Sequence, residues 1–368
     1  MGTAAQAGTV VISVDTFIGC DDGSIDGMDV VVDGAMLTID CDHTLASLTL
    51  VNNGVVTHTS GGIIPPGETE PVGMHLTVTG DISIEGGSLI RANRRGFASA
   101  SGPGGGGSDD YAGGGAHAGA GGDSSSLASY PDGRGGSSYG SVHEPVSLGS
   151  GGGRDTNNAV GGGRGGGAIR LTVGGTCLID GSVEALGGDS NGSQAGAGAG
   201  GSIWIACGTL AGSGQIVADG GIGTSQSGGG GGGRIALEYE MSTFIGPVSA
   251  FGGMGSVDGG AGTVLLDNRT GGGTAMLVID NNASTDRALT EINGEVVVTA
   301  DVLVTNGAHI GHATGLQGAH LTVNGSLEIG EGGSVDIRLR GHGAGEGPGT
   351  GSQGTNYAGG AGHGGAGG

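Results

Sequence analysis

Short segments in which apolar and polar residues alternate recur along the chain, most regularly between residues 168 and 267. Side chains of a strand point to opposite faces with a period of two. Aligning the segments therefore gives columns of equivalent residues. One column holds Ile169, Ile203, Ile235 and Val264, and the next holds Leu171, Ile205, Leu237 and Leu266. These apolar columns predict strands stacked in parallel around a shared core.

A second, shorter apolar run follows each of the first three segments and ends in a glycine pair. The runs are Ser182–Ala185, Gln215–Ala218 and Pro247–Ala250, and the pairs begin at Gly187, Gly220 and Gly252, which are 33 and 32 residues apart. A fixed period of this length is typical of a solenoid. We therefore predict an all-β fold, a right-handed parallel β-helix or β-solenoid. The alternative is an antiparallel sandwich with similar strands.

The positions between the apolar columns belong to the other face of the predicted sheet. They hold Arg170, Trp204, Ala236 and Leu265. We expect this face to point outward, with Arg170 and Trp204 as neighbours on adjacent coils.

Glycine-rich tracts separate the strands at residues 187–201, 219–233 and 252–262. Such tracts either stay loose as flexible loops or stack as extended chains of the polyproline-II type, in a polyglycine-II-like arrangement. Because they recur at the same point of every coil, their ends are held in register. This favours ordered tracts bonded to one another.

A second level of repetition spans about 245 residues. Ala319–Gly325 repeats Met74–Gly80, with His320 lying 245 positions after His75, and Tyr357–His363 repeats Tyr111–His117. We predict a first unit at 1–272, made of N-terminal coils at 1–95, a glycine-rich insertion at 96–167 and coils of about 33 residues at 168–272. A second unit at 273–368 ends within its own insertion, so we expect the chain to be part of a longer protein.

Composition narrows the possible functions. The chain has 95 glycines, only 3% aromatic residues and a net charge of −23. The charge argues against nucleic acid and anionic membrane surfaces as partners. No apolar run is long enough for a transmembrane helix, so we expect no membrane insertion.

Three runs, Asp29–Ile39, Leu76–Gly80 and Gly200–Ile205, resemble the glycine-rich repeat segments of very large secreted bacterial surface proteins. Similar blocks occur in glycine-rich secreted proteins of plants. The resemblance implies an extracellular or cell-surface β-helical repeat protein. It carries no catalytic residue over to this chain.

Two groups of residues are candidates for binding. Asp21, Asp22, Asp26 and Asp29 gather around Gly23 and Gly27, where hard oxygen ligands on a tight loop would suit Ca²⁺. The alternative, which we favour, is that they are solvated acids of turns. The candidate ligand contacts are Trp204, Arg170, His117 and Tyr111. For His117 and Tyr111 we favour polar contacts with the surrounding glycine backbone, and for Arg170 and Trp204 a cation–π stack.

The four cysteines form no metal-binding pattern, because no Cys-x-x-Cys occurs. The alignment places Cys177 opposite Leu210 and Cys207 opposite Val173, which predicts two buried thiols. Cys20 and Cys41 could pair across the N-terminal coils, and the sequence leaves their state open.

The function that these features favour is structural or adhesive: a β-helical stalk or filament component with a glycine-rich contact layer, binding itself, neighbouring repeats or surface glycans. We predict no enzyme and no cofactor other than the weak Ca²⁺ candidate. A carbohydrate-binding or carbohydrate-active β-helix is the alternative, although Glu184 and Glu238 lie two coils apart on different strands. Ice binding by flat threonine ladders is the third candidate, and we expect the threonines not to repeat in register.

Overall fold

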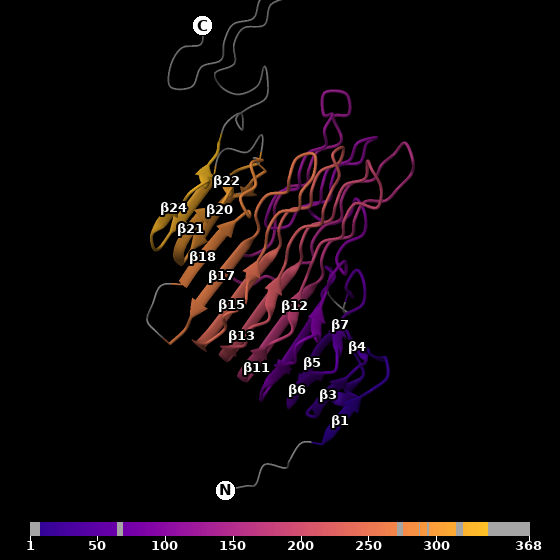
Figure 1. Ribbon diagram of the computed structural model, residues 1–368, viewed down its shortest axis with the longest axis vertical. Coiled ribbons are helices and arrows are strands. Elements are labelled where there is room, and N and C mark those ends of the chain that lie inside the picture. Colours follow the sequence, from indigo (N-terminus) through magenta and orange to yellow (C-terminus); the bar gives the residue numbers. More distant parts are fainter. Residues whose placement is uncertain are drawn as a thin grey trace, which may run out of the picture.

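The computed structural model describes residues 8–64, 69–270, 275–286, 288–292, 294–313 and 319–337. Within these ranges the chain is all-β, without an α-helix, and its only helical turn is the 3-10 turn η1 at Gly23–Ile25. The strands are stacked side by side along the long axis of the molecule (Figure 1). The repeated segment Tyr357–His363 lies outside the described residues.

The largest sheet runs the length of the described chain. Its strands, in spatial order, are β1 (Thr9–Ile12), β3 (Asp29–Asp33), β6 (Ser47–Val51), β9 (Ile82–Ile84), β11 (Ala168–Ile179), β13 (Ser202–Ala211), β15 (Arg234–Ser242), β17 (Thr263–Asn268), β18 (Ala275–Asp280), β21 (Ala300–Thr305) and β24 (Leu327–Ile329). Two further strands, β5 (Cys41–Leu45) and β8 (Met74–Val78), continue the sheet beside β11. The long strand β11 pairs with β8 through its first half and with β9 through its second half.

A second parallel sheet faces the first. It contains β2 (Thr16–Ile18), β4 (Met36–Ile39), β7 (Val55–Thr57), β10 (Leu89–Arg91), β12 (Ser182–Glu184), β14 (Gln215–Val217) and β16 (Val248–Ser249). Two small sheets complete the fold: β19 (Thr290–Glu291), β22 (His309–Gly311) and β25 (Ser334–Val335) form one, and β20 (Gly294–Val298) and β23 (Ala319–Val323) form the other.

The predicted columns are confirmed residue by residue. Ile169 pairs with Ile203, Ile203 with Ile235, and Ile235 with Val264. All four side chains are buried in one core between the two sheets. Cys177 and Cys207 pair with Leu210 and Val173 as the alignment indicated, and both thiols are free and buried. The parallel pairing excludes the antiparallel sandwich for this part of the chain.

The chain reverses direction after β17. Strand β18 pairs with β17 in antiparallel fashion, through Val264–Val278, Leu265–Leu277 and Leu266–Met276. This is the one antiparallel pairing between strands within the described residues. From β18 onward the coils are parallel to one another again.

The reversal corrects one expectation, namely that Ala236 and Leu265 would point into solvent. Both are buried, at 0% and 3% exposure, in a second core with Leu277, Ile279 and Val302. This second core lies on the opposite face of the large sheet. Val264 therefore contributes to the first core while its neighbour Leu265 contributes to the second, because adjacent strand residues face opposite ways.

Glycine-rich tracts extend from the strands on one side of the molecule, where they run next to one another (Figure 1). We call this region the glycine layer, and it comprises residues 104–107, 113–122, 149–153, 161–167, 195–201, 227–233 and 258–262. The tracts are ordered, as expected. Backbone hydrogen bonds join them across long sequence distances, from Gly196 N to Gly153 O at 3.0 Å and from Gly231 N to Gly115 O at 2.9 Å.

Glycine is required at many positions of the layer because there is no room for a Cβ atom there. A Cβ atom on Gly165, Gly196 or Gly228 would lie less than 3.0 Å from a carbonyl oxygen of a neighbouring tract. None of the glycines of the layer has a positive φ of the kind that only glycine adopts readily. Close approach of backbones, rather than an unusual backbone conformation, therefore explains the composition.

The insertion at 96–167 ties the coils together. Ala112 N donates to Gln194 O at 2.8 Å, and Ala112 O accepts from Gly228 N at 3.1 Å. Ala120 N donates to Leu289 O at 2.7 Å. One insertion thus bonds to tracts of the coils at 168–267 and to the segment that follows the chain reversal.

Candidate functional site

The acids proposed for Ca²⁺ binding are used to fix turns. Asp22 caps η1 and accepts from Ser24 N at 3.0 Å. Asp26 accepts from Thr44 N at 3.2 Å and lies 3.1 Å from His43 Nδ1. Asp29 accepts from Ser47 Oγ at 2.6 Å, while Asp21 lies at the rim of a pocket. Within the ranges that the structure describes, no three potential metal ligands gather in one group.

Many other acids bind backbone of the next coil. Asp81 accepts from Thr176 N at 2.6 Å, Asp180 from Ser213 N at 3.0 Å and Asp219 from Phe251 N at 2.6 Å. Hydrogen bonds to charged groups are stronger than neutral ones. These carboxylates fasten one coil to the next and are not free for chemistry.

His117 lies in the glycine layer and Tyr111 lies just before one of its tracts, and the two residues do not form one site. His117 is fully buried, with Nδ1 3.0 Å from Gly200 O and its ring 4.9 Å from that of Tyr139. Burial, helped by the nearby Arg234, lowers the pKa of His117 to about 3. Tyr111 instead packs on Tyr130, with ring centroids 4.8 Å apart.

Arg170 and Trp204 do meet on the face of the large sheet that points away from the first core. The Arg170 guanidinium carbon lies 4.1 Å from the Trp204 ring centroid. The same row continues through His75 on β8 to Asp42 on β5, and His75 Nδ1 lies 3.1 Å from Asp42 Oδ1. We call Asp42, His75, Arg170 and Trp204 the outer ladder.

Trp204 anchors one end of the outer ladder. Its indole Nε1 donates to Glu238 Oε1 at 2.7 Å, and Glu238 forms an ion pair with Arg269. The Trp204 ring also packs against the second core. Arg170 covers the Trp204 ring, and the indole N–H, which is the only hydrogen-bond donor of that side chain, is already bound to Glu238. Trp204 therefore has little free surface on which a sugar could stack.

The other end of the ladder borders a cavity of about 580 Å³, here called the ladder pocket. Its polar lining consists of Asp21, Asp42, His75 and Arg170, and its apolar lining includes Met74, Pro145 and Val146. Cys20 and Cys41 also line the pocket. They form a disulfide, which answers the question that the sequence left open.

Two nitrogens beside the ladder pocket lack a hydrogen-bond partner although they are buried: His75 Nε2 and Arg170 Nε. Burial and the positive charge of Arg170 lower the pKa of His75, opposed by Asp42. His75 is therefore neutral at neutral pH. The Asp42 carboxylate can only accept, so Nδ1 carries the proton and Nε2 presents a lone pair. The pair offers one acceptor and one donor, the combination that a hydroxyl group satisfies.

The two glutamates considered for a glycosidase-like site have structural partners. Glu184 accepts from Asn93 Nδ2 at 2.7 Å and from Gln215 Nε2 at 3.1 Å, and Glu238 is held by Trp204 and Arg269 as described. The two acids are thus engaged separately, each with its own donors.

The expectation that threonines do not repeat in register is wrong at three places. Thr38 pairs with Thr57 and Thr176 with Thr209, and the third row is longer. Thr44, Thr77 and Thr172 form a row across β5, β8 and β11. The row is a single column bordered by the charged residues of the outer ladder, and Thr172 is followed by Ala206 on β13. It does not make the flat, repeated surface that ice binding would require.

No family model matches the chain, and neither a curated protein nor a solved structure shows significant similarity to it. Among the described residues there is no helix with the length and hydropathy needed to span a bilayer. The site must therefore be interpreted from its own chemistry.

Sequence reasoning found Arg170 and Trp204 but missed Asp42 and His75. The signal was present, because Cys41–Leu45 is another copy of the strand pattern and aligns with Met74–Val78. The copies differ in their apolar residues, so the match becomes visible only with the strand register known.

Proposed function

We propose that this chain is an extracellular structural or adhesive repeat protein, in which the stacked coils form a β-solenoid stalk stiffened along one side by a polyglycine-II-like layer. The observation that carries the proposal is the hydrogen bonding of one insertion to successive coils, through Ala112, Gly115 and Ala120. In simple solenoids each repeat contacts only its neighbours. Here the layer adds contacts over longer distances, which would resist bending and peeling.

The Cys20–Cys41 disulfide supports a location outside the cell, because disulfides persist in oxidising compartments and are rare in the cytosol. The carboxylates that bond one coil to the next would, like the glycine layer, make the stalk harder to bend or peel apart. The excess of acids also keeps such an elongated molecule soluble and discourages random self-association.

Pulling on the two ends of single molecules tests this proposal. We expect the coils and the insertion to resist together and to unfold in one cooperative event. Gly196→Ala, which places a Cβ against Gly113 O, should lower the unfolding force, whereas Gly86→Ala, whose Cβ would meet nothing closer than 3.8 Å, should not. Coils that peel off one at a time at equal force in both variants would argue against a load-bearing layer.

A second candidate function, glycan binding, is favoured by the ladder pocket. The unpartnered His75 Nε2 could accept from a sugar hydroxyl and Arg170 Nε could donate to one, once the side chains that cover these two buried atoms move aside. Asp21 and Asp42 add acceptors for further hydroxyls and disfavour anionic sugars. Pro145 and Val146 supply apolar surface for the sugar ring. This arrangement would make the stalk adhesive without any catalytic step.

Screening the protein against immobilised neutral oligosaccharides, followed by calorimetry on any hit, tests the second candidate. His75→Leu and Arg170→Met should each weaken binding about tenfold, the effect of about 1.4 kcal/mol. Arg94→Met is the matched control, because Arg94 forms an exposed ion pair with Asp189. Absence of binding to every neutral glycan, or hits that both variants retain, would exclude the ladder pocket as a glycan site.

A further inference from the structure

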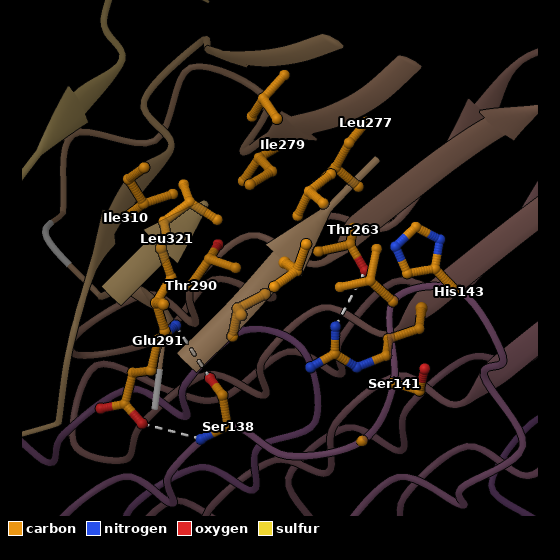
Figure 2. Close-up of a pocket in the computed structure, with 18 of the residues that line it drawn as sticks. Ser138, Ser141, His143, Thr263, Leu277, Ile279, Thr290, Glu291, Ile310 and Leu321 are labelled. Carbon is orange, nitrogen blue, oxygen red and sulfur yellow. Dashed lines mark hydrogen bonds between the residues drawn. The ribbon is translucent and has the colours of Figure 1, made fainter. Parts of the chain in front are cut away.

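A second cavity, of about 380 Å³, lies where the first unit meets the coils that follow the chain reversal. We call it the junction cavity. Its volume falls in the range of pockets that hold small organic molecules. Figure 2 shows two unlike walls: Leu277, Ile279, Ile310 and Leu321 on one side, and Ser138 and Ser141 on the other.

Arg234 supplies a positive charge to the polar wall of the junction cavity. It is only 5% exposed. Its Nε and Nη2 donate to Tyr139 O at 2.9 and 2.6 Å, and its Nη1 donates to Thr263 Oγ1 at 3.3 Å. Both partners are neutral, and a guanidinium has five N–H donors in total.

No carboxylate among the described residues forms an ion pair with Arg234. Burial lowers the pKa of its guanidinium to about 10, and the opposing influence comes from Tyr139. The group is therefore still charged at neutral pH. Buried charges in proteins are normally paired, so this arginine lacks the counter-ion that its surroundings call for.

Glu291, the one acid among the residues that line the cavity, is engaged elsewhere. Glu291 accepts from Ser138 N at 2.9 Å, and its own backbone N–H donates to Ser138 Oγ at 3.2 Å (Figure 2). This reciprocal pair joins β19 to the loop around Ser138 at one edge of the cavity. It does not neutralise Arg234.

We propose that the junction cavity binds a small organic carboxylate with an apolar body, its carboxylate against Arg234 and its body against Leu277, Ile279 and Ile310. The carboxylate supplies the missing negative charge and accepts the guanidinium N–H groups that Tyr139 and Thr263 leave over. The apolar body covers side chains of the second core that otherwise border an open cavity. A purely inorganic anion would satisfy Arg234 and leave the apolar wall uncovered.

Calorimetry with three probes on the full chain tests this inference: phenylacetate, phenylacetamide and inorganic phosphate. We expect phenylacetate to bind, and phenylacetamide, which has the same shape without the charge, to bind at least about tenfold more weakly. Phosphate should show no binding at the same concentrations. Equal binding of the acid and its amide, or tighter binding of phosphate than of phenylacetate, would overturn the proposal.

Two variants locate the binding. Arg234→Gln should abolish the preference for phenylacetate over phenylacetamide, and circular dichroism checks that it folds. Ser141→Trp is the second variant, since Ser141 is exposed on a loop at the cavity and a large side chain there should block entry without disturbing a core. Arg94→Gln, far from the cavity on an exposed ion pair, is the control. Phenylacetate binding that survives in Ser141→Trp with unchanged affinity would place the site elsewhere.

Discussion

The two parts of this molecule, the sheet cores and the glycine layer, exclude water in opposite ways. In the first core, Ile203 and its column neighbours fill the space between sheets with side chains. In the glycine layer, Gly162 and Gly165 pack against neighbouring backbone because they have no side chain. The cores are held by apolar contacts that need no direction, and the layer is held by directed N–H to C=O bonds.

The difference explains why both kinds of sequence are needed in one chain. Glycine loses the most conformational freedom on folding, so a glycine tract orders only when its ends are fixed. The strands fix those ends at the same point of each coil. In return, the layer bonds coils that the sheets join only to their nearest neighbours. The comparison predicts that smaller side chains destabilise the sheet core, whereas larger side chains destabilise the glycine layer.

Removing volume should be most harmful in the sheet core. Ile203 is fully buried between Ile169 and Ile235. We expect Ile203→Ala to lower the free energy of unfolding by about 2–5 kcal/mol, and Ile203→Val by about 0.5–1.5 kcal/mol. Urea unfolding followed by circular dichroism measures both. A decrease in the free energy of unfolding of less than about 1 kcal/mol for Ile203→Ala would show that this column contributes little to the stability of the core.

Adding volume should be harmful in the glycine layer. Gly162 and Gly161 are adjacent and differ in one respect: a Cβ on Gly162 would lie less than 3.0 Å from Gly152 O, while one on Gly161 would lie 3.5 Å from the side chain of Ser99. We expect Gly162→Ala to cost about 1–3 kcal/mol, as overpacking does.

Gly161→Ala is the matched control for this change. It should be neutral or stabilise by up to about 1 kcal/mol, since alanine restricts the unfolded chain. Thermal unfolding of the pair gives opposite signs if the layer is packed as described. Equal and small effects of both substitutions would mean that the tracts are loose.

Acid should weaken the glycine layer through His117. Its pKa in the folded protein is lowered to about 3, chiefly by burial, whereas an unfolded histidine titrates near 6.5. The unfolded state therefore takes up a proton that the folded state refuses. The free energy of unfolding is therefore unaffected by protonation of His117 above pH 6.5, and it decreases as the pH falls from 6.5 toward 3.

We expect about 1 kcal/mol of lost stability between pH 6 and pH 5 from this residue. Urea unfolding at the two pH values should show a smaller difference in His117→Gln than in the unchanged protein. His58, whose pKa is lowered to about 4 by burial, is present in both and cancels. An identical pH dependence in the two proteins would show that His117 is not held neutral.

The sequence by itself determined the strand columns at 168–267. Alternating apolar positions fixed which residues share a column, down to Cys177 opposite Leu210, because strand side chains repeat every two residues and stacked copies must keep their columns apolar. The recurrence of glycine tracts at one point of each coil also indicated that they would be ordered. These are local or periodic properties, which a sequence displays directly.

Only the tertiary structure decided how the coils are covered. The sequence does not show whether the apolar residues Ala236 and Leu265 face water or a second core. The reversal between β17 and β18 buries them, because it brings Leu277 into the same core. The partners of the insertion, the alignment of Asp42 with His75 and the placement of Arg234 beside a cavity likewise depend on contacts between distant segments. Glycine carries no side chain that could mark its partner, so the pattern of the layer exists only in the folded chain.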